Sequence, residues 1–241
     1  MAGSSKIEWT EATWNPVTGC NQISPGCAHC YAKTFAERWR GVSGHPYEQG
    51  FDLRLWPERL DVPLRWRNPK TIFVNSMSDL FHEAIPDDYV AQIFETMRAA
   101  HWHTFQVLTK REERMLDLAP SLTWPSNVWM GVTIENRGFV HRADALREVP
   151  AAVRFISAEP LLGPLEGLSL ASIAWLIAGG ESGPRHRRVD ADWIRDLRDR
   201  CAGTETAFFF KQWGGARPKS NGRLLDGRLH DDYPQRAAAA A

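Results

Sequence analysis

Three of the four cysteines crowd into eleven residues near the start of the chain. Cys20, Cys27 and Cys30 have the spacing Cys–x6–Cys–x2–Cys, and Gly19 and Pro25 allow the segment to curl around a compact group. In a reducing compartment such a cluster indicates a metal site rather than a disulfide framework. Three thiolates can each bind one iron of a four-iron cluster, which leaves the fourth iron without a protein ligand. Because an open coordination position can accept a reactant, a [4Fe-4S] cluster is the first hypothesis for this loop.

Zinc is the main alternative occupant of the loop, because Cys–x–x–Cys is a common zinc half-site. His29 or His45 would then supply the fourth ligand. However, the chain has no second Cys–x–x–Cys pair, and His29 lies between two cysteines, where its ring cannot easily join them at one ion. Cys201 lies in an expected helix far along the chain and is interpreted as a packed small residue. The cluster, zinc and no metal all remain open, with the cluster favoured.

The elements that position the loop alternate between short apolar runs with polar ends, as in buried parallel strands, and amphipathic helices. Six strands are expected over residues 72–74, 105–108, 128–132, 153–156, 175–178 and 207–210, with a seventh near 7–14. Helices are expected over residues 87–100, 136–149 and 190–202. This rhythm predicts an α/β fold, an incomplete (β/α) barrel of about six to seven mostly parallel strands. An open doubly wound sheet is the competing architecture.

Both architectures place ligands at the carboxyl ends of the strands, where this chain carries its polar residues. These candidates for binding are Asn75, Ser76, Ser78, Asp79, Thr109, Lys110, Thr133, Glu135, Ser157, Glu159, Gly180, Glu181 and Lys211. Hydroxyl, amide, carboxylate and ammonium groups converging on one edge of a sheet predict a site for a polar small molecule.

The cysteine loop and the strand ends together resemble the radical S-adenosylmethionine (SAM) enzymes. Those enzymes carry three cysteines, usually spaced Cys–x3–Cys–x2–Cys, on a loop after the first strand of a partial barrel, with an aromatic residue such as Tyr31 near the last cysteine. The fuller match is to a radical SAM-like family of unknown function common in phages and bacteria. The segments that carry this resemblance are Trp9–Thr10, Thr13–Trp14–Asn15–Pro16, the cysteine loop, Asn75–Ser–Met–Ser–Asp79–Leu–Phe81, Leu108–Thr109–Lys110–Arg111, Gly131–Val–Thr133, Ser157–Ala–Glu159–Pro160, Gly179–Gly–Glu181–Ser182 and Phe210–Lys–Gln–Trp213–Gly214.

The resemblance implies a reaction and two cofactors. The open iron of a [4Fe-4S] cluster would bind SAM, and one electron would cleave SAM to methionine and a 5′-deoxyadenosyl radical, which takes a hydrogen atom from substrate. An electron donor such as flavodoxin or ferredoxin is implied. In similar enzymes the first strand end after the cysteines contacts the methionine moiety, here Asn75, Ser76, Ser78 and Asp79. Asp79 either pairs the SAM ammonium or caps the following turn. Gly179–Gly–Glu181 resembles an element that contacts the SAM amino group, but it lies several strands later and is assigned to adenosine or substrate.

The composition limits the partners. Among 241 residues, 29 Lys and Arg balance 29 Asp and Glu, so no whole-protein charge attracts nucleic acid. The basic run Pro184–Arg–His–Arg–Arg188 is interpreted as a solvated loop or a phosphate-binding patch. A nucleotide or modified DNA is one substrate hypothesis, and a zinc-stabilised nucleic-acid-binding protein without catalysis is the alternative function. The chain lacks an apolar segment long enough for a membrane span, so we expect a cytoplasmic protein, in the host if it is phage-encoded. One domain is expected over residues 1–241, with 214–241 as an extension or tail.

Overall fold

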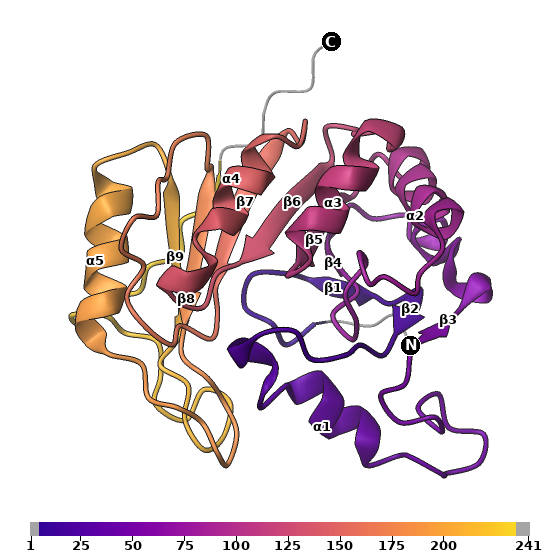
Figure 1. Ribbon diagram of the computed structural model, residues 1–241, viewed down its shortest axis with the longest axis horizontal. Helices are drawn as coiled ribbons and strands as arrows, with labels where there is room; N and C mark the ends of the chain where they lie inside the picture. Colours follow the sequence, from indigo (N-terminus) through magenta and orange to yellow (C-terminus); the bar gives the residue numbers. More distant parts are fainter. Residues whose placement is uncertain (1–4, 235–241) are drawn as a thin grey trace. The chain divides into compact units, whose positions relative to one another are not determined.

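The computed structural model describes residues 5–234. The chain divides into two compact units (Figure 1). The first comprises the residues up to Trp129 together with Pro150–Ala152, and the second comprises Met130–Val149 and the residues from Val153 onward. The expected single domain stays a prediction. Of the expected tail at 214–241, residues 235–241 lie outside the described residues.

The first unit contains short strands and three α-helices, together with several 3-10 turns. Its strands are β1 (Ala12–Trp14), β2 (Val17–Thr18), β3 (Arg54–Leu55), β4 (Thr71–Val74) and β5 (Thr104–Thr109). Its α-helices are α1 (Tyr31–Glu37), α2 (Asp87–Ala99) and α3 (Glu112–Leu118), and its 3-10 turns are η1 (Pro25–Cys27), η2 (Pro57–Arg59), η3 (Val62–Arg65) and η4 (Ala119–Ser121). β1, β4 and β5 pair in parallel, whereas β2 and β3 form a small antiparallel pair.

The second unit repeats the strand–helix rhythm. Its strands are β6 (Val128–Thr133), which starts at the end of the first unit, β7 (Val153–Ala158), β8 (Trp175–Gly179) and β9 (Ala207–Gln212). Its helices are η5 (Arg137–Phe139), α4 (His141–Arg147) and α5 (Ala191–Ala202). β7, β8 and β9 pair in parallel, and α5 lies alongside β9 and β8 (Figure 1).

The parallel strands follow the order β1, β4, β5, β6, β7, β8, β9 in one seven-stranded sheet. β1 and β9 are the edge strands of this order, so the barrel is incomplete. The predicted fold class, an α/β incomplete barrel of about six to seven mostly parallel strands, is therefore confirmed. All parallel strands of such a sheet end at the same edge, which is where ligands bind in folds of this class.

Apolar periodicity explains why the helices form where they do. In α2 the buried side chains recur at helical spacing and cover one face, namely Tyr89, Val90, Ile93, Phe94 and Met97. Pro86 precedes the helix, where its missing N–H costs nothing. In α5 the Asp190 side chain caps the start by accepting from the Asp192 N–H at 2.9 Å, and Gly203 follows the last residue.

Two expected elements are shorter than predicted. The strand expected near residues 7–14 covers only Ala12–Trp14, because the Thr10 N–H donates to the Ile7 carbonyl and closes a turn before it. The helix expected over 136–149 is correct only as α4, His141–Arg147. The Asn136 side chain accepts from the Gly138 N–H at 2.9 Å, and this local bond holds the preceding residues in the separate 3-10 turn η5.

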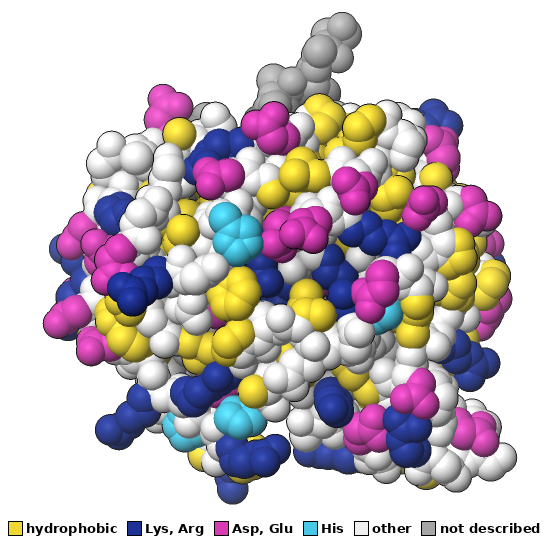
Figure 2. Space-filling model, viewed as in Figure 1, with side chains coloured by type: hydrophobic (Ala, Val, Ile, Leu, Met, Phe, Trp, Pro, Cys, Tyr) yellow, Lys and Arg dark blue, Asp and Glu magenta, His cyan; other side chains and the backbone are white. Residues whose placement is uncertain are grey.

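Figure 2 shows one face of the molecule, on which basic and acidic side chains are interspersed. Between residues 5 and 234, none of the helices combines the length and the apolar character that a membrane crossing demands.

The cap of α5 provides a test of the fold. Asp190→Ala removes the acceptor for the Asp192 N–H, and we expect it to lower the free energy of unfolding by about 1 kcal/mol in urea titrations. Asp196→Ala is the matched control, because it removes only an exposed ion pair with Arg200 and is expected to cost less than about 0.5 kcal/mol. Equal effects of the two substitutions would contradict the capping role.

Candidate functional site

Backbone contacts place the first cysteine at the end of β4. Gly19 forms an isolated parallel bridge with Ser78, and its N–H donates to the Met77 carbonyl at 2.9 Å. Gly19 has φ +89°, and a Cβ there would lie 2.2 Å from the Asp52 carbonyl oxygen, so only glycine fits. Cys20 consequently begins its loop beside the polar residues that follow the strand.

Local turn chemistry positions the other two cysteines. The Cys27 N–H donates to the Ser24 carbonyl at 3.0 Å within η1, and the Cys30 N–H donates to the Cys27 carbonyl at 3.2 Å. Cys30 is the residue that precedes α1, and its carbonyl accepts from the Thr34 N–H. The Cys–x–x–Cys spacing is therefore one turn that leads directly into a helix.

The three thiols are free and partly exposed. None is in a disulfide. Cys20 and Cys30 pack against one apolar cluster formed by Ala32, Ala36, Phe51 and Met77. Burial and the negative charge of Asp79 raise the pKa of the Cys20 thiol to about 11, and the charge of Cys27 also acts to raise it. Binding a metal would replace the proton, since a coordinating thiol is deprotonated.

A cluster and a single ion require different arrangements of their ligands. In the part of the chain that the structure describes, no three His, Cys, Asp or Glu side chains converge on a position for one metal ion. A zinc site needs such convergence, because all four ligands bind one atom. In a four-iron cluster each thiolate binds its own iron, so the three sulfur atoms need only surround a larger group.

Asp79 organises the polar strand ends next to the cysteines. Its carboxylate accepts from Thr109 Oγ1 at 2.7 Å, from the Lys110 N–H at 3.0 Å and from the Phe81 N–H at 3.0 Å. The first two bonds tie the end of β4 to the end of β5. The third bond is the predicted turn-capping role, and pairing of the SAM ammonium stays a prediction.

Asn75 carries a buried donor that the chain does not use. The residue is 2% exposed and has φ +58°, and its Oδ1 accepts from the Val17 N–H at 3.4 Å. Its Nδ2 has no hydrogen-bond partner among residues 5–234. A buried amide donor without a partner is costly, and the oxygen of a ligand would satisfy it. Ser76 Oγ donates to Asn15 Oδ1 at 3.2 Å and Ser78 Oγ donates to the Val17 carbonyl at 3.1 Å, so both hydroxyls are tied to β1 and β2.

Arg111 is a residue of this site that the sequence prediction missed. Its Nη2 lies 3.8 Å from Cys20 Sγ, its Nη1 donates to Glu83 Oε2 at 2.5 Å, and it also contacts Asn21. The side chain is only 10% exposed, and its Nε is 4.0 Å from Asp79 Oδ2. The motif Leu108–Thr109–Lys110–Arg111 contains it, but only the fold shows that the guanidinium reaches the cysteine loop.

In the second unit the predicted carboxylates bind the chain's own cations. Glu135 is fully buried and accepts from Arg142 Nη1 at 3.1 Å. Glu159 pairs with Lys211 Nζ at 3.2 Å. Glu181 accepts two bonds from the Arg187 side chain, at 2.5 and 2.9 Å, and a third from its N–H. These carboxylates sit at strand ends as predicted, but each neutralises a neighbouring cation there.

The remaining predicted residues of this unit are two buried hydroxyl residues and a glycine. Thr133 and Ser157 are buried at the ends of β6 and β7, and Thr133 Oγ1 has no hydrogen-bond partner in the described chain. At Gly180 a Cβ would lie 2.2 Å from the Trp213 carbonyl oxygen. The close approach predicted for this glycine is therefore made by the chain's own backbone. Cys201 is buried in α5, as the packing interpretation predicted.

The family of the chain follows from a comparison with family models. The model described as protein of unknown function (DUF5131) matches residues 4–234, which is nearly the whole chain. The chain belongs to the DUF5131 family. A search of curated proteins found no match.

Several solved structures are similar to this DUF5131 chain, among them two of spore photoproduct lyase. Spore photoproduct lyase complexed with dinucleoside spore photoproduct has 16% sequence identity and a TM-score of 0.49. A mutant of that lyase with bound AdoMet and dinucleoside spore photoproduct has 17% identity and a TM-score of 0.47. Each comparison covers 85% of the DUF5131 chain and 64% of the lyase chain, so the chain spans less than two thirds of the length of these proteins.

The buried ion pair of the second unit provides a test of the strand-end geometry. Arg142→Met leaves Glu135 buried without its guanidinium, and we expect the free energy of unfolding to fall by about 3–5 kcal/mol. Arg65→Met, which removes an exposed ion pair with Asp61, is expected to cost less than about 1 kcal/mol. A urea midpoint for Arg142→Met as high as that of the control would mean that the pair is not needed.

Proposed function

We propose that this chain holds a [4Fe-4S] cluster on Cys20, Cys27 and Cys30 and uses it to cleave SAM and take a hydrogen atom from a substrate. The observation that carries the proposal is the grouping of three free thiols on one loop at the carboxyl end of β4. Three cysteine ligands leave the fourth iron of the cluster without a protein ligand. A reactant can bind at that open coordination position and to the unsatisfied polar groups beside it.

The cluster, when bound, supplies the electron that breaks a sulfonium bond of SAM. The chain's part is to bind and orient SAM. Asn75 Nδ2 is a buried donor suited to the SAM carboxylate. The Asp79 carboxylate accepts three hydrogen bonds from the chain, and its oxygens offer about four acceptor sites, so one remains for the SAM ammonium. Lys110 contributes its ammonium at the same strand end.

Arg111 is proposed to act on the site through charge. A buried guanidinium beside Cys20 Sγ offsets the negative charge that thiolate ligands bring to the loop. Its bonds to Asn21 and Glu83 hold it there. Arg111 is therefore a positioning residue, and its effect should appear in the reduction potential.

The other cofactor and partner assignments are proposals at a coarser level. Thr133, Glu135, Ser157, Glu159, Gly180, Glu181 and Lys211 are proposed to lie near adenosine or substrate, with Thr133 Oγ1 as the hydroxyl that a ligand can satisfy. A nucleotide or modified DNA is the proposed substrate, an electron donor such as flavodoxin or ferredoxin the proposed partner, and the cytoplasm the proposed location.

Cysteine substitutions test the cluster assignment. After anaerobic reconstitution, we expect the protein to hold iron and sulfide in near-equal amounts and, once reduced with SAM, to release 5′-deoxyadenosine. Cys27→Ser should lose both properties, because a four-iron cluster with two protein ligands is not retained. The matched control is Cys201→Ser, which changes a buried cysteine of α5 and should keep both.

Two results would contradict the cluster assignment. One is a protein that remains colourless and free of iron after reconstitution. The other is stoichiometric zinc that Cys27→Ser abolishes and that Cys201→Ser leaves in place, which would support the zinc-stabilised alternative instead.

Arg111→Met tests the charge beside Cys20. A nearby cation stabilises the more negative, reduced state, so its removal should make the reduction potential of the reconstituted protein more negative while the iron content stays unchanged. Arg98→Met removes the same charge from an exposed ion pair on α2 and should leave the potential at the wild-type value. A potential that moves equally in both variants would exclude a local role for Arg111.

A further inference from the structure

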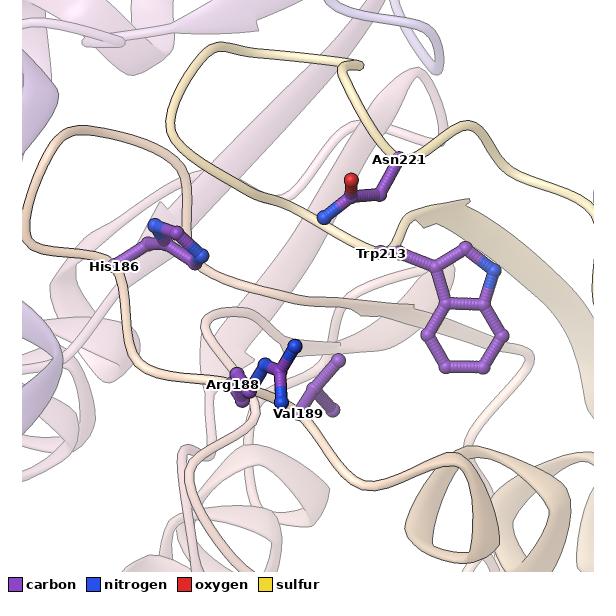
Figure 3. Close-up of a pocket in the computed structure, with 5 residues that line it drawn as sticks. All are labelled: His186, Arg188, Val189, Trp213 and Asn221. Carbon is purple, nitrogen blue, oxygen red and sulfur yellow. The ribbon is translucent and has the colours of Figure 1, made fainter.

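A pocket lies in the second unit, outside all the residues proposed above to bind the cluster or SAM. It has a volume of about 370 Å³ and is lined by His186, Arg188, Val189, Trp213 and Asn221. These residues come from two segments, the loop after β8 and the stretch after β9 (Figure 3). The volume is at the small end of the range for small-molecule sites.

Backbone hydrogen bonds fix the two segments against each other. Ser182 and Gly215 form a parallel bridge, in which the Gly215 N–H donates to the Glu181 carbonyl and the Gly183 N–H donates to the Gly215 carbonyl, both at 2.9 Å. The Trp213 N–H donates to the Gly222 carbonyl at 3.0 Å and closes the second segment on itself. The pocket is therefore formed before any ligand arrives, which reduces the entropy cost of binding.

The pocket exposes cationic and donor groups whose charge the chain does not neutralise. Within residues 5–234, no acidic side chain pairs with Arg188, whereas its neighbour Arg187 is bound to Glu181. His186 Nδ1 lies 3.0 Å from the Gly183 carbonyl and donates to it, which makes Nε2 of the neutral ring an acceptor for an O–H or N–H group of a ligand. The side chains of His186, Arg188 and Asn221 point toward one another across the space between the two segments (Figure 3). Such a convergence suits an anion with several acceptor oxygens.

An aromatic wall borders this polar group. The Trp213 Nε1–H donates to the Leu224 carbonyl at 2.9 Å, and its ring meets Phe210 edge to face with centroids 4.7 Å apart. The indole is thus held in place, and Trp213 and Val189 both line the pocket. Flat aromatic surfaces stack nucleobases irrespective of their sequence.

From these observations we infer that the pocket binds a nucleotide unit, with its phosphate on Arg188 and Asn221 and its base against Trp213. A phosphate alone would not use the indole, and an uncharged planar ligand would leave the guanidinium unneutralised. The inference does not depend on the cluster or on SAM, since every residue involved belongs to the two segments of the second unit. It also explains which part of the basic run 184–188 acts: Arg188 binds, Arg187 is structural and Arg185 is solvated.

Calorimetric titration of the full-length chain tests the inference. The probes are the four ribonucleoside 5′-monophosphates, the corresponding nucleosides, inorganic phosphate and a short single-stranded oligodeoxyadenylate. At least one monophosphate or the oligonucleotide should bind about 10-fold more tightly than either phosphate or the nucleoside. If a monophosphate binds more tightly than the oligonucleotide, the ligand is a free nucleotide. If the oligonucleotide binds more tightly, the ligand is a nucleic acid.

Matched arginine variants separate the pocket from general charge. Arg188→Gln should weaken nucleotide binding roughly 10-fold or more, because a charged hydrogen bond is lost. Arg185→Gln, an exposed arginine of the same loop that does not line the pocket, should leave binding within about 2-fold. Trp213→Leu should weaken the nucleotide and leave phosphate binding unchanged.

The inference is overturned by any of three results. These are no detectable binding by any nucleotide probe, equal losses in Arg188→Gln and Arg185→Gln, or nucleotide affinity no greater than that of phosphate. If Trp213→Leu does not fold, as judged by its thermal transition, the arginine pair and the ligand series still decide the outcome.

Discussion

The Asp79 carboxylate is the interaction on which the proposed cluster site depends. It accepts from Thr109 Oγ1, from the Lys110 N–H and from the Phe81 N–H. One buried group therefore fixes the ends of β4 and β5 and the turn that leads from β4 to α2. A carboxylate in this setting must be hydrogen-bonded, because an unpaired buried charge is expensive. Two of these donors, Thr109 and Lys110, directly precede Arg111 in the chain, so the same bonds bring its guanidinium to Cys20.

The same edge of the sheet also receives the cysteine loop. Gly19 pairs with Ser78 and, because it has no side chain, also admits the Asp52 backbone beside it, and Cys20 then lies beside Asp79 and Arg111. The site therefore combines three free thiols, a fixed cation and the Asn75 amide, whose Nδ2 has no hydrogen-bond partner among residues 5–234. We propose a distinct part for each group: the thiols hold the metal, the cation offsets their charge, and the amide binds an oxygen of the ligand.

Sequence patterns predicted the strands and the cysteine loop but not the partners of the polar groups. Apolar runs with polar ends locate β4 to β9, since burial on both faces leaves little choice of residue. Contacts between groups distant along the chain have no such signature. Two examples are the contact of Arg111 with Cys20 and the ion pair of Arg142 with Glu135. Both depend on how the strand ends are arranged in space. Local side-chain hydrogen bonds also ended helices that the apolar periodicity predicted to be longer. At Asn136 such a bond starts the separate 3-10 turn η5 before α4.

Electron paramagnetic resonance of the reduced, anaerobically reconstituted protein tests the central claim most directly. We expect the spectrum of a reduced four-iron cluster, and this spectrum should change when SAM is added, because SAM binds the iron that lacks a protein ligand. A cluster spectrum that SAM leaves unaltered would contradict an open iron. The absence of any cluster signal in protein that retains all three cysteines would contradict the cluster itself.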